Sequence, residues 1–194
     1  MKKFIITIGR SYGSGGRMVG LKIAEDLGIK CYNSELLIEA AKESGLCHEV
    51  FEKIDEKPIS AFLSFSAGKY DHGEMPLNHK VFLAQMQTIK KIADRESCVI
   101  VGRCADYVLK DYENVINVFI TAPFEDRVQR AIDRDNILPG KAEKRVKRID
   151  KERANYYNFY STKRWGVADS YDICLDSSKF GIEGCAKIIE SLIK

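Results

Sequence analysis

The stretch ITIGRSYGSGGRMVG, Ile6 to Gly20, decides how the rest of the chain is interpreted. It begins with β-branched residues, turns through Gly13, Gly15 and Gly16, and continues into a segment with the composition of a helix. A helix that starts directly after a strand and a glycine turn presents unpaired amides and the positive end of its dipole, which together bind phosphate. The stretch therefore predicts an anion-binding loop, with a purely structural turn as the alternative.

The loop lacks the Gly-Lys-Ser/Thr ending that is typical of a phosphate-binding loop. Either Gly16 or Arg17 falls at the lysine position, depending on whether one residue is counted as an insertion. If it is Arg17, a planar guanidinium replaces the ammonium, and Met18 replaces the hydroxyl that holds magnesium. We therefore assign no metal ligand. The predicted phosphate-binding residues are Ser11, Gly13, Ser14, Gly15, Gly16 and Arg17.

Apolar segments of strand length alternate with helical segments along the chain, which is the pattern of a parallel sheet covered on both faces. The predicted strands span residues 4–9, 30–33, 97–102, 114–120 and 171–176. They predict an α/β fold, a doubly wound five-stranded parallel sheet in one domain over residues 1–194. The region from Cys47 to Asn78 has no clear period, and we expect an insertion there that contacts a ligand.

The composition is that of an ordinary globular protein, with 45% hydrophobic and 30% charged residues. The net charge of +3 is too small to indicate binding to nucleic acid. No apolar run approaches the roughly 20 residues that span a bilayer, and the start of the chain is too polar for a secretory signal. We expect a cytoplasmic protein with neither nucleic acid nor a membrane as a partner.

The six cysteines form no CxxC pair, which favours buried reduced thiols over zinc or disulfide chemistry.

A second candidate site follows the third predicted strand. Gly102 and Arg103 fall at its carboxyl end, where open α/β sheets bind their ligands. Asp106 comes three residues later, which would place it on the same helical face as Arg103. Arg103 could hold a phosphate or a base edge. The alternative is a surface Arg–Asp pair of little energetic value.

Basic residues concentrate between Arg127 and Arg164, which indicates a local anion site. Phosphoryl transfer needs fixed positive charge around phosphate oxygens and the exclusion of water, and a closing arginine-bearing lid would supply both. A solvated charged helix is the alternative. The segment ANYYNFY, residues 154–160, places aromatic side chains in this polar region. They should pack on the core, on a second subunit or on a base, so a homodimer stays open.

Four stretches together resemble the cytidylate-kinase-like family, a branch of the nucleoside-monophosphate kinases. They are GRSYGSGGRMVG (9–20), VIVGRCADYVL (99–109), FITAPFEDRVQRAIDRD (119–135) and DKERANYYNFYSTKRWGVADSYDICLDSSKFGIEG (150–184). The resemblance runs nearly from end to end. It implies a P-loop kinase-like domain with an acceptor-binding insertion at about residues 33–95 and a lid at about residues 136–164.

The resemblance also implies a role for particular residues. The loop from Gly13 to Arg17 would hold ATP, with Mg²⁺ as cofactor. Asn33, Ser34, Arg103 and Asp106 would bind the acceptor, although Cys104 and Ala105 separate an arginine and an aspartate that are adjacent in authentic cytidylate kinases. The implied catalytic residues, with the last three in the lid, are Arg17, Arg145, Arg148 and Arg153.

Three hypotheses remain from the sequence. The leading one is a magnesium-dependent phosphotransferase that moves the γ-phosphoryl group of ATP to a nucleoside monophosphate, with CMP or dCMP first. A nucleotide-binding or regulatory protein with little catalysis is the second, because Met18 stands where the magnesium hydroxyl is expected. The third is a kinase of a small acceptor that is not a nucleotide. The expected partners are therefore nucleotide substrates.

Overall fold

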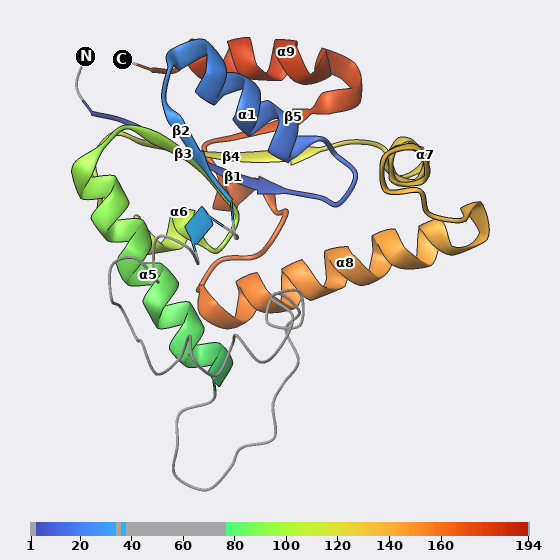
Figure 1. Ribbon diagram of the computed structural model, residues 1–194, viewed down its shortest axis with the longest axis horizontal. Coiled ribbons are helices and arrows are strands. Elements are labelled where there is room, and N and C mark those ends of the chain that lie inside the picture. Colours follow the sequence, from blue (N-terminus) through green and yellow to red (C-terminus); the bar gives the residue numbers. More distant parts are fainter. Residues whose placement is uncertain (1–2, 34–35, 38–76, 194) are drawn as a thin grey trace, which may run out of the picture.

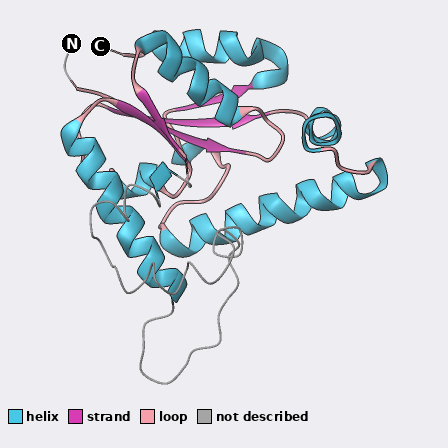
Figure 2. Cartoon of the chain, viewed as in Figure 1, coloured by secondary structure: helices cyan, strands magenta, loops and turns pink. Residues whose placement is uncertain are grey.

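A five-stranded sheet forms the centre of the computed structural model, which describes residues 3–33, 36–37 and 77–193 (Figures 1 and 2). Its strand order is β2-β3-β1-β4-β5, and every neighbouring pair is parallel. The strands are β1 (Ile5–Arg10), β2 (Lys30–Tyr32), β3 (Cys98–Val101), β4 (Val115–Thr121) and β5 (Ile173–Asp176). The predicted α/β class and the parallel sheet are confirmed.

Helices cover both faces of this sheet. Figure 1 shows α1 and α9 together over one face, and α5 and α6 over the other. The described helices are α1 (Gly16–Leu27), α5 (Leu77–Arg95), α6 (Ala105–Val108), α7 (Phe124–Asp135), α8 (Pro139–Tyr160) and α9 (Ser177–Glu190), with a short 3₁₀ turn at Ala168–Ser170. None of the helices in the described ranges is long and apolar enough to cross a membrane.

Two apolar clusters explain why the central strands carry apolar residues at successive positions. On one face Ile6 and Ile8 pack with side chains of α1 and α9, and on the other face Ile5 packs with side chains of α5 and α6. All three isoleucines are at most 2% exposed. A central parallel strand is buried on both faces, so it needs apolar residues at successive positions rather than at alternate ones.

The regions expected to bind ligand differ in how they fold. The lid region contains one continuous helix, α8, which begins at Pro139 with proline in its first turn, where the missing N–H costs little. Most of the predicted insertion, including Cys47, lies outside the described residues. Its described end is α5, whose Ile89 and Ile92 pack in the same cluster as β3.

Of the described cysteines, Cys98, Cys104 and Cys185 are buried free thiols, Cys31 is half-buried and Cys174 is exposed.

Candidate functional site

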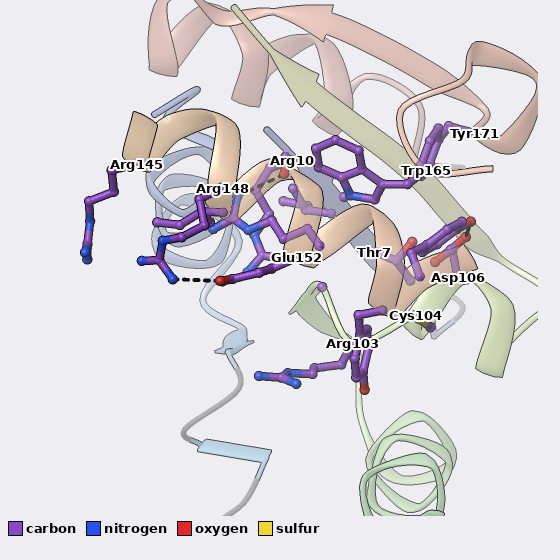
Figure 3. Close-up of a pocket in the computed structure, with 17 residues that line it drawn as sticks. Thr7, Arg10, Arg103, Cys104, Asp106, Arg145, Arg148, Glu152, Trp165 and Tyr171 are labelled. Carbon is purple, nitrogen blue, oxygen red and sulfur yellow. Dashed lines mark hydrogen bonds and ion pairs between the residues drawn. The ribbon is translucent and has the colours of Figure 1, made fainter. Parts of the chain in front are cut away.

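A cavity of about 650 Å³ opens at the carboxyl ends of β1 and β3, beneath α8 (Figure 3). Its charged lining is mainly cationic, because only the two carboxylates Asp106 and Glu152 accompany a larger set of arginines. That set is Arg10, Arg103, Arg145, Arg148 and Arg153. The carboxyl edge of a parallel sheet is the usual ligand position in open α/β folds. The cavity is therefore a candidate anion site.

Arg10, the last residue of β1, extends over the turn that follows β3. Its guanidinium lies so close to Gly102 that a Cβ added there would be 2.1 Å from Nη1. Its aliphatic stem packs against Gly16, where an added Cβ would be 2.6 Å from the Cβ of Arg10. Burial, followed by the neighbouring Arg153 and Arg103 guanidiniums, lowers the pKa of Arg10 well below its usual value. Arg10 thus connects the first turn of α1 with the β3–α6 turn.

The β3–α6 turn has an unusual backbone. Gly102, Arg103 and Cys104 have φ angles of 81°, 59° and 53°, which places three consecutive residues in the left-handed region. Non-glycine residues there carry strain of about 1–3 kcal/mol each, and such strain clusters at functional sites. The turn directs Arg103 into the cavity, with its guanidinium carbon 5.2 Å from the ring centre of Tyr156.

The expected relation between Arg103 and Asp106 is wrong. Helix α6 begins only at Ala105, because the two preceding residues are left-handed, so the pair does not share a helical face. Asp106 is only 6% exposed and does not form a surface pair with Arg103. It accepts a hydrogen bond from the Tyr157 hydroxyl at 2.5 Å and lies 3.8 Å from the Lys163 ammonium. Burial raises the pKa of this carboxyl, while Tyr157 and Lys163 oppose the rise.

Helix α8 is anchored to the loop that follows β1. The Asp150 carboxylate accepts from the Tyr12 amide at 2.7 Å and from the Arg127 guanidinium at 2.5 Å. Arg153, three residues further along the helix, donates to the carbonyl of Arg10 at 3.0 Å. Burial lowers the pKa of Arg153 to about 10. These contacts hold α8, the helix of the predicted lid, against the loop.

The other lid arginines differ in their surroundings. Arg148 pairs with Glu152 at 2.6 Å, and both side chains line the cavity while remaining partly exposed. Arg145 lies at the outer end of the cavity in Figure 3, well apart from Arg10. Arg103, Arg145, Arg148 and Arg153 therefore meet in one cavity as the sequence suggested, but only Arg103 and Arg153 lie close enough to Arg10 to lower its pKa markedly.

The glycine loop has the backbone geometry of an anion cradle. Gly13 and Gly15 have φ angles of 78° and 77°, and a Cβ on Gly13 would lie 2.5 Å from the carbonyl oxygen of Arg127. The first-turn amides of α1 have no acceptor within a helix. Among the residues that the structure describes, the buried Ser14 hydroxyl has no hydrogen-bond partner either. Unpaired donors around a glycine turn fit the phosphates of ATP.

The fit to Mg²⁺ is weaker. Met18, at the position where a hydroxyl would hold the ion, is 49% exposed, and Arg17 beside it is also exposed. Within the described ranges, no three histidine, cysteine or acidic side chains converge on a possible metal position. Mg²⁺ binds largely through waters and substrate phosphates. If it accompanies ATP here, the nucleotide's phosphates would be its main anchor.

Asn33, a predicted acceptor-binding residue, and the aromatic side chains of α8 form contacts within the chain. Asn33 accepts the Leu36 amide at 3.0 Å, which is a helix-capping contact, and Ser34 lies outside the described residues. The aromatic side chains of α8 pack within the chain, since Tyr160 stacks on Phe82 of α5 with 3.8 Å between ring centres. Packing on the core thus accounts for part of the cluster, and the homodimer stays a prediction.

Sequence reasoning missed several residues of the cavity. Arg10 lies within the opening stretch but was passed over, because nothing near it in sequence shows that its side chain reaches Gly102. Trp165 and Tyr171 also line the cavity. Both pack on Phe119 of β4, with 5.4 Å and 4.9 Å between ring centres. A tryptophan within a polar arginine-bearing segment was the available signal for this aromatic wall.

The sequence pattern of the cytidylate kinase-like family matches residues 5–179. The chain belongs to this family. Family membership makes it a kinase-like phosphotransferase, for which use of ATP and Mg²⁺ is general. Cytidylate kinase of Pyrococcus horikoshii is 27% identical over 98% of this chain and 88% of its own length. Cytidylate kinase of Methanocaldococcus jannaschii is 27% identical over 97% of both chains.

Solved structures agree with this placement. An uncharacterized protein from Eubacterium ventriosum superposes with a TM-score of 0.76 and is 31% identical, covering 97% of both chains. Shikimate kinase from Bacteroides thetaiotaomicron superposes with a TM-score of 0.55 at 13% identity, again over 97% of both chains. The second likeness concerns the fold alone, and it confirms the kinase-like α/β architecture.

Proposed function

We propose that this kinase-like protein transfers the γ-phosphoryl group of ATP to a nucleoside monophosphate, with CMP or dCMP as the first acceptor to test. The observation that carries the proposal is the arginine-lined cavity beside a glycine loop with unpaired donors. The loop suits the donor phosphates, and the cavity suits an anionic acceptor. The curated relatives that are named cytidylate kinases support the choice of acceptor.

The chemistry needs no protein nucleophile. An oxygen of the acceptor phosphate attacks the γ-phosphorus, the bond from that phosphorus to its bridging oxygen breaks, and ADP leaves. Arg103 and Arg153 would neutralise the charge on the approaching phosphates. Helix α8, fixed over the loop through Asp150, would keep water away from the reacting groups. Mg²⁺, when bound with ATP, supplies further charge neutralisation on the donor phosphates.

The aromatic wall supports a nucleotide rather than a purely anionic acceptor. Tyr156, Trp165 and Tyr171 line the cavity together with the arginines. Stacking on aromatic faces binds planar bases, and arginine binds phosphate. A cavity that has both features suits a molecule with a base at one end and a phosphate at the other.

A nucleotide-binding protein with little turnover is the second candidate. Met18 favours it, because its thioether replaces the hard oxygen ligand expected for Mg²⁺. Titration calorimetry with ATP, CMP, dCMP and UMP, followed by a coupled ADP-release assay, separates the two. Binding with turnover supports the kinase. Nucleotide binding without turnover, unchanged in Arg17→Ala, supports the second candidate, and no binding at millimolar concentration contradicts both.

A further inference from the structure

Arg10 is a cation that faces other cations. Among the described residues, the charged groups that lower its pKa most are Arg153 and Arg103, with Arg17 contributing less, and the Tyr171 hydroxyl acts in the opposite direction. Throughout the described ranges, its guanidinium forms no ion pair and no hydrogen bond to a side chain. Arg127, by contrast, is paired with Asp150.

The surrounding chain is shaped to hold Arg10 in this position. Gly102 leaves the space that the guanidinium occupies, since a Cβ would be 2.1 Å from Nη1 and 2.9 Å from Cζ. The backbone carbonyl of Arg10 is held by Arg153 at 3.0 Å. The guanidinium therefore occupies space that is open because residue 102 has no Cβ.

Holding several partly buried guanidiniums together without an anion is unfavourable, because each loses hydration and repels its neighbours. A bound phosphate would reverse both effects, since guanidinium–phosphate contacts are charge-assisted and often bidentate. The stem of Arg10 packs on the first turn of α1 and its head on the β3–α6 turn. Arg10 thus lies between the loop proposed for ATP and the turn that carries Arg103.

We infer that Arg10 binds the phosphate group of the acceptor, together with Arg103 and Arg153. We also infer that position 102 requires glycine because a Cβ there would displace the Arg10 guanidinium. The inference rests on the proposed function, and it names Arg10 as a residue that supplies fixed charge on the acceptor side of the cavity. It also gives Gly102 a specific role in acceptor affinity. Arg17, exposed on α1, lines no part of the cavity.

The test compares Arg10→Met with Arg95→Met, a control that removes an arginine from an exposed pair with Glu96. Methionine keeps an apolar stem of similar length at position 10 and removes the guanidinium group. Calorimetry should show CMP binding weakened about 10- to 100-fold in Arg10→Met, with ATP binding unchanged. The control should match the wild type for both ligands. Equal CMP affinity in Arg10→Met and wild type would overturn the inference.

Gly102→Ala tests the position of the Arg10 guanidinium independently. It should displace the Arg10 guanidinium and weaken CMP binding, whereas Gly140→Ala, with nothing within 4 Å of its added Cβ, should not. In the Arg10→Met background, Gly102→Ala should cause no further loss, because the group it displaces is already gone. Full additivity of the two losses would contradict the proposed role of Gly102.

Stability gives a readout that separates binding from structure. Removing an unpaired, partly buried charge should leave the melting temperature of Arg10→Met equal to that of the wild type or above it by about 2–4 °C. A variant that loses CMP binding because it is damaged would melt at a lower temperature. A lower melting temperature together with equal losses of CMP and ATP binding would therefore overturn the inference.

Failure of the proposed function gives a different result. If the wild type binds none of CMP, dCMP and UMP, inorganic phosphate becomes the probe, with binding followed by ³¹P NMR line broadening. Phosphate binding that is lost in Arg10→Met but kept in Arg95→Met would retain Arg10 as an acceptor-side anion ligand for another substrate. No phosphate binding, or equal binding in both variants, would overturn the inference as well.

Discussion

The Asp150 carboxylate of α8 accepts a hydrogen bond from the backbone amide of Tyr12, with 2.7 Å between nitrogen and Oδ1. The same carboxylate pairs with Arg127 of α7 at 2.5 Å, and both side chains are less than one-fifth exposed. One acidic residue of α8 therefore joins three elements: α8, α7 and the glycine loop. The lid and the loop are expected to act as a unit.

Asp150→Ala should destabilise the protein by about 2–4 kcal/mol, because it leaves a largely buried arginine and a buried amide without their acceptor. Asp150→Asn keeps an oxygen for the Tyr12 amide and should lose less. Urea unfolding measures both values. Glu143→Ala, which breaks an exposed pair with Lys147 on the same helix, is the control and should cost under about 1 kcal/mol. Equal losses for Asp150→Ala and the control would mean that the contacts of Asp150 with Tyr12 and Arg127 do not stabilise the protein.

Gly13→Ala and Gly28→Ala form a matched pair, since both positions have positive φ angles, 78° and 62°. Gly28→Ala meets no atom within 4 Å, so it should cost only the left-handed strain of about 1–2 kcal/mol. Gly13→Ala adds a clash with the Arg127 carbonyl, worth about 1–3 kcal/mol more, and should also weaken ATP binding. Urea unfolding and ATP titration provide the comparison. A Gly13→Ala variant no less stable than Gly28→Ala would argue against the close packing of the loop.

Asp106→Asn tests the buried carboxyl through pH. Burial raises the folded-state pKa of Asp106, so its contribution to stability is greatest below the unfolded-state pKa of about 4 and is lost as pH rises through the folded-state value. Asparagine has no such dependence and can still accept from Tyr157. The free energy of unfolding of wild type minus that of Asp106→Asn should therefore fall as pH rises from about 4, the unfolded-state value, through the raised folded-state pKa. A difference that rises with pH would show that Lys163 and Tyr157 outweigh burial.

Arg103→Ala should weaken CMP binding by about 10- to 100-fold, as expected for a charged hydrogen-bond partner, and leave ATP binding within about 2-fold. The physical reason is its place in the cavity, where its guanidinium carbon lies 5.2 Å from the ring centre of Tyr156. Titration calorimetry measures both affinities, with Arg95→Ala as the control. Equal loss of CMP and ATP affinity would contradict the assignment of Arg103 to the acceptor.

The sheet could be predicted from the sequence because parallel strands buried on both faces leave a strong local signal. The run that contains Ile5, Ile6 and Ile8 is apolar on both faces, and each predicted strand lies within two residues of the observed one. Pro123 immediately precedes the first turn of α7, a position where its missing N–H costs little. These features depend on residues that are close together in the chain.

The cavity could be predicted only in part, because its decisive contacts join distant segments. The left-handed φ angle of Cys104 separates Arg103 from Asp106, and no local pattern marks a non-glycine residue for that conformation. The placement of Arg10 over Gly102 depends on the pairing of β1 with β3, and the burial of Asp106 depends on Tyr157 of α8. Residue types suggested an anion site, whereas tertiary packing determined which arginines compose it.

The most direct test of the central claim is ³¹P NMR of the 194-residue protein incubated with ATP, Mg²⁺ and CMP. The account predicts that the resonances of CDP and ADP grow together while those of ATP and CMP decline, and that Arg10→Met and Arg103→Ala slow this exchange while Arg95→Ala does not. No nucleoside diphosphate formed from CMP, dCMP or UMP, with the protein folded and ATP bound, would contradict it.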